Sequence, residues 1–156
     1  MTIAAEPEPV EVRVAGIEPA RRSQHAWDPL FAVILEEIGG TRRTQVVMRK
    51  PEADGIAMHL QNMPTTRPLT YSLMAGLLQA LGGRLLEARI TSTDGQTIYA
   101  SAVVSGCYGT QVVDARPSDV INLALRLGAP IRVYPAVFAT QPGAAPQAGP
   151  PGLDWA

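Results

Sequence analysis

The first third of the chain alternates apolar and charged residues, as strands with one buried face do. Valines alternate with charged neighbours over residues 10–14 and predict a first strand. A nearly continuous apolar run at residues 30–35 predicts a second, more deeply buried strand. Residues 42–48 predict a third strand, and because Gly39-Gly40 separates it from the second, we expect the two to form a hairpin.

The hydrophobic period then changes to three and four residues, which is typical of helices. Pro51 begins the first predicted helix and Pro64 ends it, since proline suits the first turn and stops a helix elsewhere. Residues 69–81 predict a second helix, which the Gly82-Gly83 pair ends. Its apolar stripe consists of four leucines: Leu73, Leu77, Leu78 and Leu81.

Three more strands and a third helix follow. With an Asp-Gly turn between the first two, the strands are expected at residues 84–93, 97–105 and 108–113. Pro117 and Gly128 suit the two ends of a helix that is apolar around most of its circumference. Most of this helix should therefore be buried, and a short strand at residues 131–133 comes after it.

The order of strands, helices, strands and helix, with hairpins dominating, favours an α+β fold. We expect a single domain with a largely antiparallel or mixed sheet and about three helices packed on it. The length of 156 residues allows one sizeable core. The expected boundaries are an N-terminal strand and loop (1–29, with a loose leader at 1–8 and the loop at 18–29), a main domain (30–139) and a disordered Pro/Gly/Ala-rich tail (140–156).

Composition narrows the function classes only slightly. The net charge of -1 gives no overall attraction to nucleic acid or to anionic membranes, so a polyanion would have to meet a local basic patch. Cys107 is the only cysteine, which excludes an internal disulfide. The N-terminus lacks the features of a signal peptide, and no apolar run reaches the roughly 18 residues of a membrane span. We therefore expect a cytoplasmic protein without a membrane partner.

Charged residues gather where the third helix is expected to begin, at Asp114, Arg116, Ser118 and Asp119. A helix N-terminus offers free N–H groups and a positive dipole end, and a guanidinium matches phosphate. Asp114 and Asp119 could hold Mg²⁺, which takes carboxylate oxygens together with substrate phosphate. The alternative is structural: Asp119 stabilises the helix start, and Arg116 pairs with Asp114 or Glu52.

A second candidate is the basic stretch at residues 39–51, which contains no acid. Its cations could contact phosphates: Arg42, Arg43, Arg49 and Lys50. Because no aromatic side chains are interleaved with them, an ordinary solvated surface is the alternative. His25 and His59 have no metal-ligand spacing, and we expect His59 to be partly buried in its helix.

Several segments together resemble the bifunctional nuclease family, over about residues 30–138. The shorter segments are Arg67-Pro-Leu-Thr70, the helix end at 77–83, and Asp94-Gly95 with Tyr99-Ala100. The most specific segment is the run Asp114-Ala-Arg-Pro-Ser-Asp119 with the helix that follows it, which includes Leu-Ala-Leu-Arg-Leu-Gly-Ala-Pro at 123–130. The resemblance implies a single α+β domain, a homo-oligomer, and nuclease activity on both DNA and RNA. The family usually continues Arg-Pro-Leu-Thr with His-Asp, whereas this chain has Tyr71-Ser72, which removes a general base and a metal carboxylate.

Two hypotheses follow from the resemblance and the charged corner. In the first, the chain hydrolyses the phosphodiester bonds of nucleic acids. Its catalytic carboxylates Glu52, Asp114 and Asp119 would hold a divalent metal ion, for which Mg²⁺ is the expected choice. Its substrate-binding residues would then be Arg67, Tyr71, Arg116 and Ser118. In the second, the chain is a catalytically weak or inactive binding or assembly module of the same fold.

Overall fold

The fold joins two strand meanders into one curved sheet. The computed structural model describes residues 7–20, 27–94 and 97–140. The strands in these residues are β1 (Val10–Pro19), β2 (Leu30–Glu37), β3 (Arg43–Arg49), β4 (Arg84–Thr93), β5 (Ile98–Gly106), β6 (Gly109–Ala115) and β7 (Ile131–Val133). The helices are α1 (Lys50–Leu60), α2 (Thr70–Ala80), α3 (Pro117–Leu127) and α4 (Pro135–Thr140). The expected α+β fold is confirmed.

The short strand β7 connects the two halves of the sheet. The strand order is β3-β2-β1-β7-β4-β5-β6, so β7 lies in the middle although it comes last in sequence. It pairs antiparallel with β1 and parallel with β4, while every other pairing is antiparallel. The sheet is therefore mixed, and the expected β2–β3 and β4–β5 hairpins are both present. Strands β3 and β6 are its two edges.

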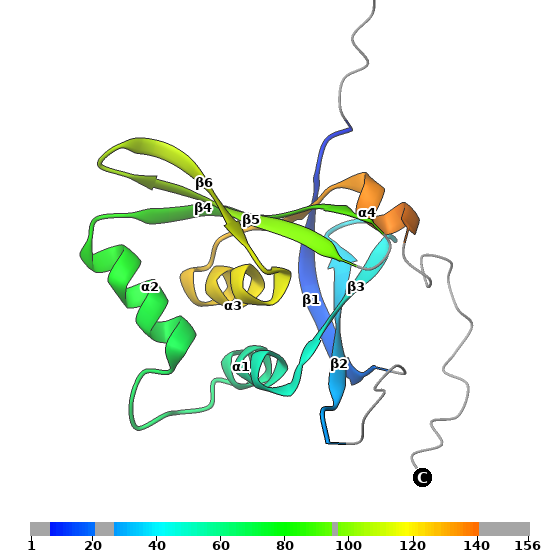
Figure 1. The fold of residues 1–156 in the computed structure, drawn as a ribbon, viewed down its shortest axis with the longest axis horizontal. Coiled ribbons are helices and arrows are strands. Elements are labelled where there is room, and N and C mark those ends of the chain that lie inside the picture. The colour runs from blue at the N-terminus through cyan, green and yellow to red at the C-terminus, as the bar shows by residue number, and fades with distance from the viewer. Residues whose placement is uncertain (1–6, 21–26, 95–96, 141–156) are drawn as a thin grey trace, which may run out of the picture.

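Helix α3 packs on this sheet and forms the centre of the core. Its buried residues include Val120, Ile121 and Ala124, which join the sheet residues in one hydrophobic cluster. Helices α1 and α2 both contact α3, and Figure 1 shows α3 between the sheet and α1. Gly128 ends α3 with a positive φ of 63°, as the sequence indicated. The prediction that most of α3 is buried is confirmed.

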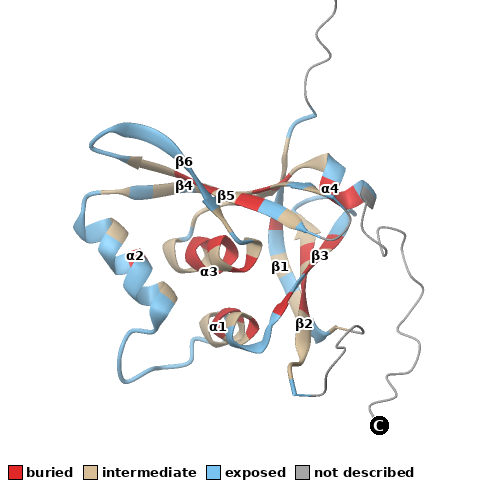
Figure 2. Ribbon diagram, viewed as in Figure 1, coloured by how far each residue is buried: buried red, intermediate tan, exposed pale blue. Residues whose placement is uncertain are grey.

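Helix α2 is the exception to this packing. Its leucine stripe exists, but Leu73, Leu77 and Leu81 are exposed, and Leu81 keeps 82% of its surface. Ala75 is its one buried residue, and Figure 2 shows α2 mostly in the exposed colour. An apolar stripe normally faces the core of its own domain, so α2 presents a large uncovered apolar surface.

Two sequence-based boundaries were wrong. Residue 18 onward was expected to be a loop, but β1 continues to Pro19, where it pairs with Phe31 of β2. The chain beyond Pro135 was not expected to form a helix, yet α4 buries Val137 and Phe138 in the core cluster. Of the predicted leader, loop and tail, residues 1–6, 21–26 and 141–156 lie outside the described residues.

Gly55 permits the close contact of α1 with α3. A Cβ at this position would lie 2.8 Å from Asn122 Oδ1 and 3.3 Å from a ring carbon of Tyr71. By helix propensity alone Gly55 costs α1 about 1 kcal/mol relative to alanine. The structure explains why glycine stands there, because both atoms belong to the side chains that connect α1 to α3 and α2.

We therefore expect Gly55→Ala to destabilise the fold by about 1–3 kcal/mol, because the overpacking outweighs the gain in helix propensity. Gly76→Ala in the middle of α2 is the matched control, since a Cβ there meets nothing within 4 Å. It should stabilise the protein by up to about 1 kcal/mol. Urea unfolding of both variants measures the difference, and equal effects would contradict the assigned role of Gly55.

Candidate functional site

The candidate site lies at the N-terminus of α3. Arg116 is the N-cap residue, with the extended φ of -69° and ψ of 144° that proline requires of the residue before it. Pro117 then opens the helix, and the backbone N–H groups of Asp119 and Val120 bond to the carbonyl of Arg116. This turn fixes the arginine beside the first-turn acid, where the helix dipole favours a negative charge.

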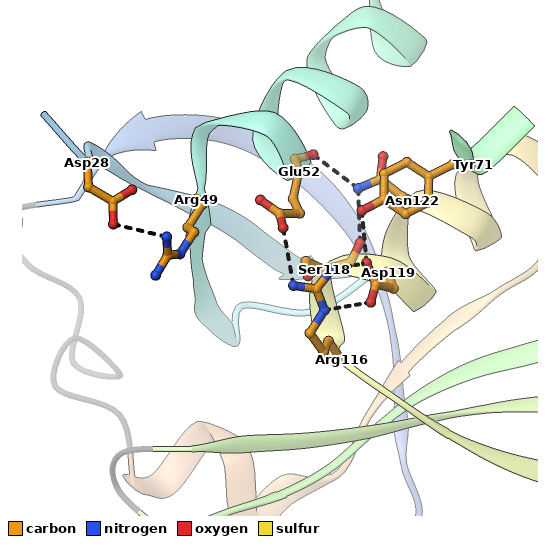
Figure 3. Close-up of polar contacts among 8 residues, drawn as sticks. All are labelled: Asp28, Arg49, Glu52, Tyr71, Arg116, Ser118, Asp119 and Asn122. Carbon is orange, nitrogen blue, oxygen red and sulfur yellow. Dashed lines mark hydrogen bonds and ion pairs between the residues drawn. The ribbon is translucent and has the colours of Figure 1, made fainter. Parts of the chain in front are cut away.

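Four side chains from three helices and their flanks meet at this point (Figure 3). Arg116 donates from Nε to Asp119 Oδ2 at 2.7 Å and from Nη2 to Asp119 Oδ1 at 2.8 Å. Its Nη1 donates to Glu52 Oε1 of α1 at 3.2 Å. The hydroxyl of Tyr71 on α2 donates to Asp119 Oδ1 at 2.8 Å. The structure thus brings together the predicted residues Glu52, Tyr71, Arg116 and Asp119.

The charges in this cluster fix the protonation of two members. The hydrogen bonds and charge of Asp119 raise the pKa of Arg116 above its usual value, so the guanidinium remains a cation. Burial, followed by the hydrogen bond to Asp119, raises the pKa of Tyr71 above its ordinary range. Tyr71 is therefore a hydrogen-bond donor at neutral pH and does not act as a base.

The cluster is paired internally, yet it stays open on one side. Arg116 keeps 65% of its side-chain surface exposed, and three of its five N–H donors are used, which leaves two for a ligand. Glu52 is 15% exposed, and its Oε2 is buried and has no hydrogen-bond partner among the residues that the structure describes. One arginine and two carboxylates give the cluster a formal charge of -1.

Asp114, the third predicted metal ligand, is not part of this cluster. It lies on the exposed strand β6, opposite Ser101, and makes no hydrogen bond or ion pair with any described residue. Within residues 7–20, 27–94 and 97–140, no group of three or more His, Cys, Asp or Glu side chains is placed to hold a metal ion. A metal here would depend on Glu52 and Asp119 together with substrate oxygens.

Two other predicted residues do not take part in the hydrogen bonds of the cluster. Ser118 is buried, and its backbone carbonyl accepts a hydrogen bond from Asn122. Arg67 lies exposed in the loop before α2 and has no hydrogen bond or ion pair with a described residue. Arg67 is thus available for an anion, whereas little of Ser118 can reach one.

Sequence reasoning missed Asn122 and Arg126 as parts of the site. Asn122 is fully buried and donates from Nδ2 to the carbonyls of Glu52 at 3.0 Å and Ser118 at 2.9 Å. Arg126 donates to Asn122 Oδ1 at 3.1 Å and to the carbonyl of Gly55 at 3.1 Å. The signal was present in the sequence, because Asp119, Asn122 and Arg126 form one polar stripe along an apolar helix.

Arg126 also contacts α2 and borders a hollow whose lining includes none of the four cluster residues. Its guanidinium donates to the hydroxyl of Ser72 at 3.2 Å and lies 5.4 Å from the centroid of the Tyr71 ring. Burial lowers the pKa of this guanidinium. The hollow has a volume of about 270 Å³ and includes Arg126, Ser72 and His59 in its wall. His59 is partly buried, as predicted.

The basic stretch at residues 39–51 is not a free cationic patch. Each of its four cations lies within ion-pair distance of an acid from a neighbouring segment: Arg42 with Glu37, Arg43 with Glu36, Arg49 with Asp28 and Lys50 with Asp54. The sequence contains no acid in the stretch itself, but the hairpin partner β2 and helix α1 supply most of these carboxylates. The hypothesis that these residues contact phosphate loses its main support.

Comparison with known proteins agrees with the fold. A family model described as "Bifunctional nuclease domain" matches residues 33–144, which is more than half of the chain. The chain belongs to the bifunctional nuclease domain family. The resemblance inferred from the Asp114–Asp119 run and the helix that follows it is thereby confirmed.

Two relatives from Mycobacterium tuberculosis match this bifunctional nuclease domain protein over most of its length. They are "Uncharacterized protein MT1877" of strain CDC 1551 / Oshkosh and "Uncharacterized protein Rv1829" of strain ATCC 25618 / H37Rv. Each is 39% identical over 129 residues, which cover 83% of this chain and 74% of the relative. Their names assign no activity. None of the described helices is both long and apolar enough to cross a membrane.

Asn122→Ala should destabilise the protein by about 3 kcal/mol. The change removes the side-chain partner of two carbonyls and of one Arg126 N–H, and it leaves a cavity at a fully buried position. Gln79→Ala, which removes an amide from an exposed position of α2, is the control and should stay within about 0.5 kcal/mol. Urea denaturation of both variants tests this, and similar losses would show that the buried amide does not connect the helices.

Stability should also fall in acid because of Glu37. The hydrogen bonds from Arg42 lower the pKa of Glu37 from 4.5 to about 2. A depressed folded-state pKa contributes stability at pH values above 4.5, and this contribution is lost as the pH falls from about 4.5 to about 2. Urea midpoints measured between pH 6 and pH 2 should decline less steeply for Glu37→Gln than for the wild type. Glu18→Gln, at an exposed acid of β1 with no ion pair to a described residue, should keep the wild-type slope.

Proposed function

We propose that this protein is a metal-dependent phosphodiesterase acting on nucleic acids, with its active site at the Glu52, Tyr71, Arg116 and Asp119 cluster. The observation that carries the proposal is the combination of two carboxylates with a largely exposed arginine that has two unused N–H donors. Membership of the bifunctional nuclease domain family supports the reaction class. The activity on both DNA and RNA comes from the family resemblance.

The donor set fits a divalent cation such as Mg²⁺. This ion binds through one or two carboxylates and completes its shell with water and substrate phosphate. Glu52 and Asp119 would hold it, since the unpartnered Oε2 of Glu52 and the local negative charge both favour a cation. When bound, the metal would lower the pKa of a water molecule and neutralise charge on the reacting phosphate. Asp114 would act outside this shell.

The chain's own residues would bind and orient the substrate. The two free N–H donors of Arg116 match a pair of phosphate oxygens, as a guanidinium fork does in other phosphate sites. Tyr71 keeps Asp119 oriented through its 2.8 Å hydrogen bond. Arg67, in the loop before α2, is free to contact the next phosphate. With a net charge of -1, affinity would come from these local contacts, and we place the protein in the cytoplasm.

One observation favours the second hypothesis, a binding or assembly module of the same fold. Asp119 takes two of the donors of Arg116 and Glu52 takes a third, so most of the guanidinium is already paired within the protein. At the positions where the family usually has His-Asp, the hydroxyls of Tyr71 and Ser72 bond to Asp119 and Arg126. In this case the cluster would only join α1, α2 and α3.

Cleavage assays with purified protein distinguish the two hypotheses. Single-stranded DNA, double-stranded DNA and RNA are incubated with Mg²⁺ or Mn²⁺, and in parallel with EDTA. The active-site proposal expects Glu52→Gln and Asp119→Asn each to reduce the cleavage rate by about 100-fold or more, because each removes a carboxylate that would hold the metal. Arg116→Lys should weaken substrate binding, since it keeps the charge and loses the fork.

Asp114→Asn is the matched control, because it removes an exposed acid close in sequence but outside the cluster. It should leave the cleavage rate within a few-fold of wild type. Cleavage that survives in both Glu52→Gln and Asp119→Asn would come from a contaminant and would falsify the active-site assignment. A pure, folded wild-type protein without turnover on any substrate would establish the module.

A further inference from the structure

The two edges of the sheet differ in how they are protected. An edge strand exposes unpaired backbone N–H and C=O groups, and charged side chains commonly keep other strands away from it. The edge strand β3 has arginines at both ends, and both are held in ion pairs. The other edge, β6, reads Gly-Thr-Gln-Val-Val-Asp-Ala and carries one charge, Asp114. Every residue from Gly109 to Asp114 is exposed.

Half of the backbone N–H and C=O groups of β6 point away from β5, where a further strand could bond to them. Its pairing with β5 ends at Gly106 and Gly109 across the two-residue turn Cys107-Tyr108, and a pair this close to the turn must be hydrogen-bonded. Bonded and non-bonded pairs alternate in an antiparallel ladder. The N–H and C=O groups of Thr110, Val112 and Asp114 therefore face the free edge.

We propose that β6 pairs antiparallel with β6 of a second copy of this chain, about a twofold axis at Val112. In this register Val112 faces Val112 of the other copy, and Thr110 faces Asp114. Three residues on each side then satisfy their outward backbone groups, and a hydroxyl meets each carboxylate. Centring the axis on Asp114 would set two carboxylates opposite each other, which destabilises a strand pair. The register centred on Val112 avoids this like-charge contact and pairs all three outward-facing residues.

Exposed apolar surface lies around this edge. Val112 retains 62% of its surface, and Val113, on the opposite face of β6, is also exposed. Figure 1 shows α2 and the β5–β6 hairpin at the same end of the long axis, away from β3. Helix α2 carries no charged residue and exposes Leu69, Leu73 and Leu77. A stable dimer buries more area than one strand pair supplies, and the exposed leucines at this end of the molecule would be available to a second copy.

The oligomeric mass of matched edge variants tests the proposal. Analytical ultracentrifugation over a micromolar concentration series should show a dimer for the wild type. Val112→Lys places two like charges face to face, so we expect the dimer dissociation constant to rise at least tenfold. Val47→Lys is the control, because Val47 is 45% exposed on the other edge strand, β3. It should remain dimeric, and circular dichroism shows whether both variants fold.

Cross-linking checks the register independently of dimer strength. In a Cys107→Ser background, Val112→Cys should form an intermolecular disulfide on oxidation, because facing residues have Cα atoms about 5.5 Å apart. Thr110→Cys should not, since the two copies of residue 110 would be roughly 14 Å apart. A monomeric wild type, a dimer unaffected by Val112→Lys, or faster cross-linking at residue 110 would each overturn the proposal. None of these readouts depends on nuclease activity.

Discussion

The contact between α1 and α3 at Gly55 and Asn122 is the constraint on which the rest of the site depends. The amide of Asn122 is fully buried, and its donors bond to carbonyls of both helices. It reaches α1 only because Gly55 has no side chain, and Arg126 bonds to both residues at once. A buried polar group that is fully bonded fixes one arrangement, since any shift would leave its partners unsatisfied. Glu52 lies one helical turn before Gly55, so this contact also sets where its carboxylate points.

This contact also helps to position the charged side chains at the N-terminus of α3. Arg116 precedes Pro117, which holds it in an extended conformation, and Asp119 lies in the first turn beside it. Glu52 and Tyr71 come from the other two helices. Asn122 bonds to the backbone of Glu52, and the guanidinium of Arg126 lies over the ring of Tyr71. Three helices thus contribute to the pairing, while the outer side of Arg116 remains in solvent. A site of this kind can exchange part of its internal pairing for a phosphate, because a guanidinium has more donors than two carboxylates use.

The elements of the fold were largely predictable from the sequence, because period and turn residues act locally. The alternation of β1, the proline and glycine at the ends of α3 and the Asp-Gly hairpin each have a local physical cause. Helix α4 was missed since it has only six residues, and its burial of Val137 and Phe138 depends on a sheet far away in sequence. The same limit applies to the site. Local reasoning found Arg116 and Asp119, whereas the acids that pair with Arg42 and Arg43 come from β2 and become neighbours only in the hairpin.

The strand β6 connects the proposed chemistry of this bifunctional nuclease domain protein with its proposed assembly. It ends at Ala115, and the next residue is the arginine of the cluster. A strand paired on one side only is held by half of its backbone groups, and edge strands open more readily than central ones because fewer bonds resist opening. A second copy bonded to Thr110, Val112 and Asp114 would hold this strand on both sides and so reduce the freedom of Arg116. It would also place Asp114 in the interface rather than at the metal, which agrees with its separation from Glu52 and Asp119. Assembly and phosphate binding would then act on consecutive residues of one chain segment, and the exposed sequence of β6 would have a role distinct from that of the charged cluster that follows it.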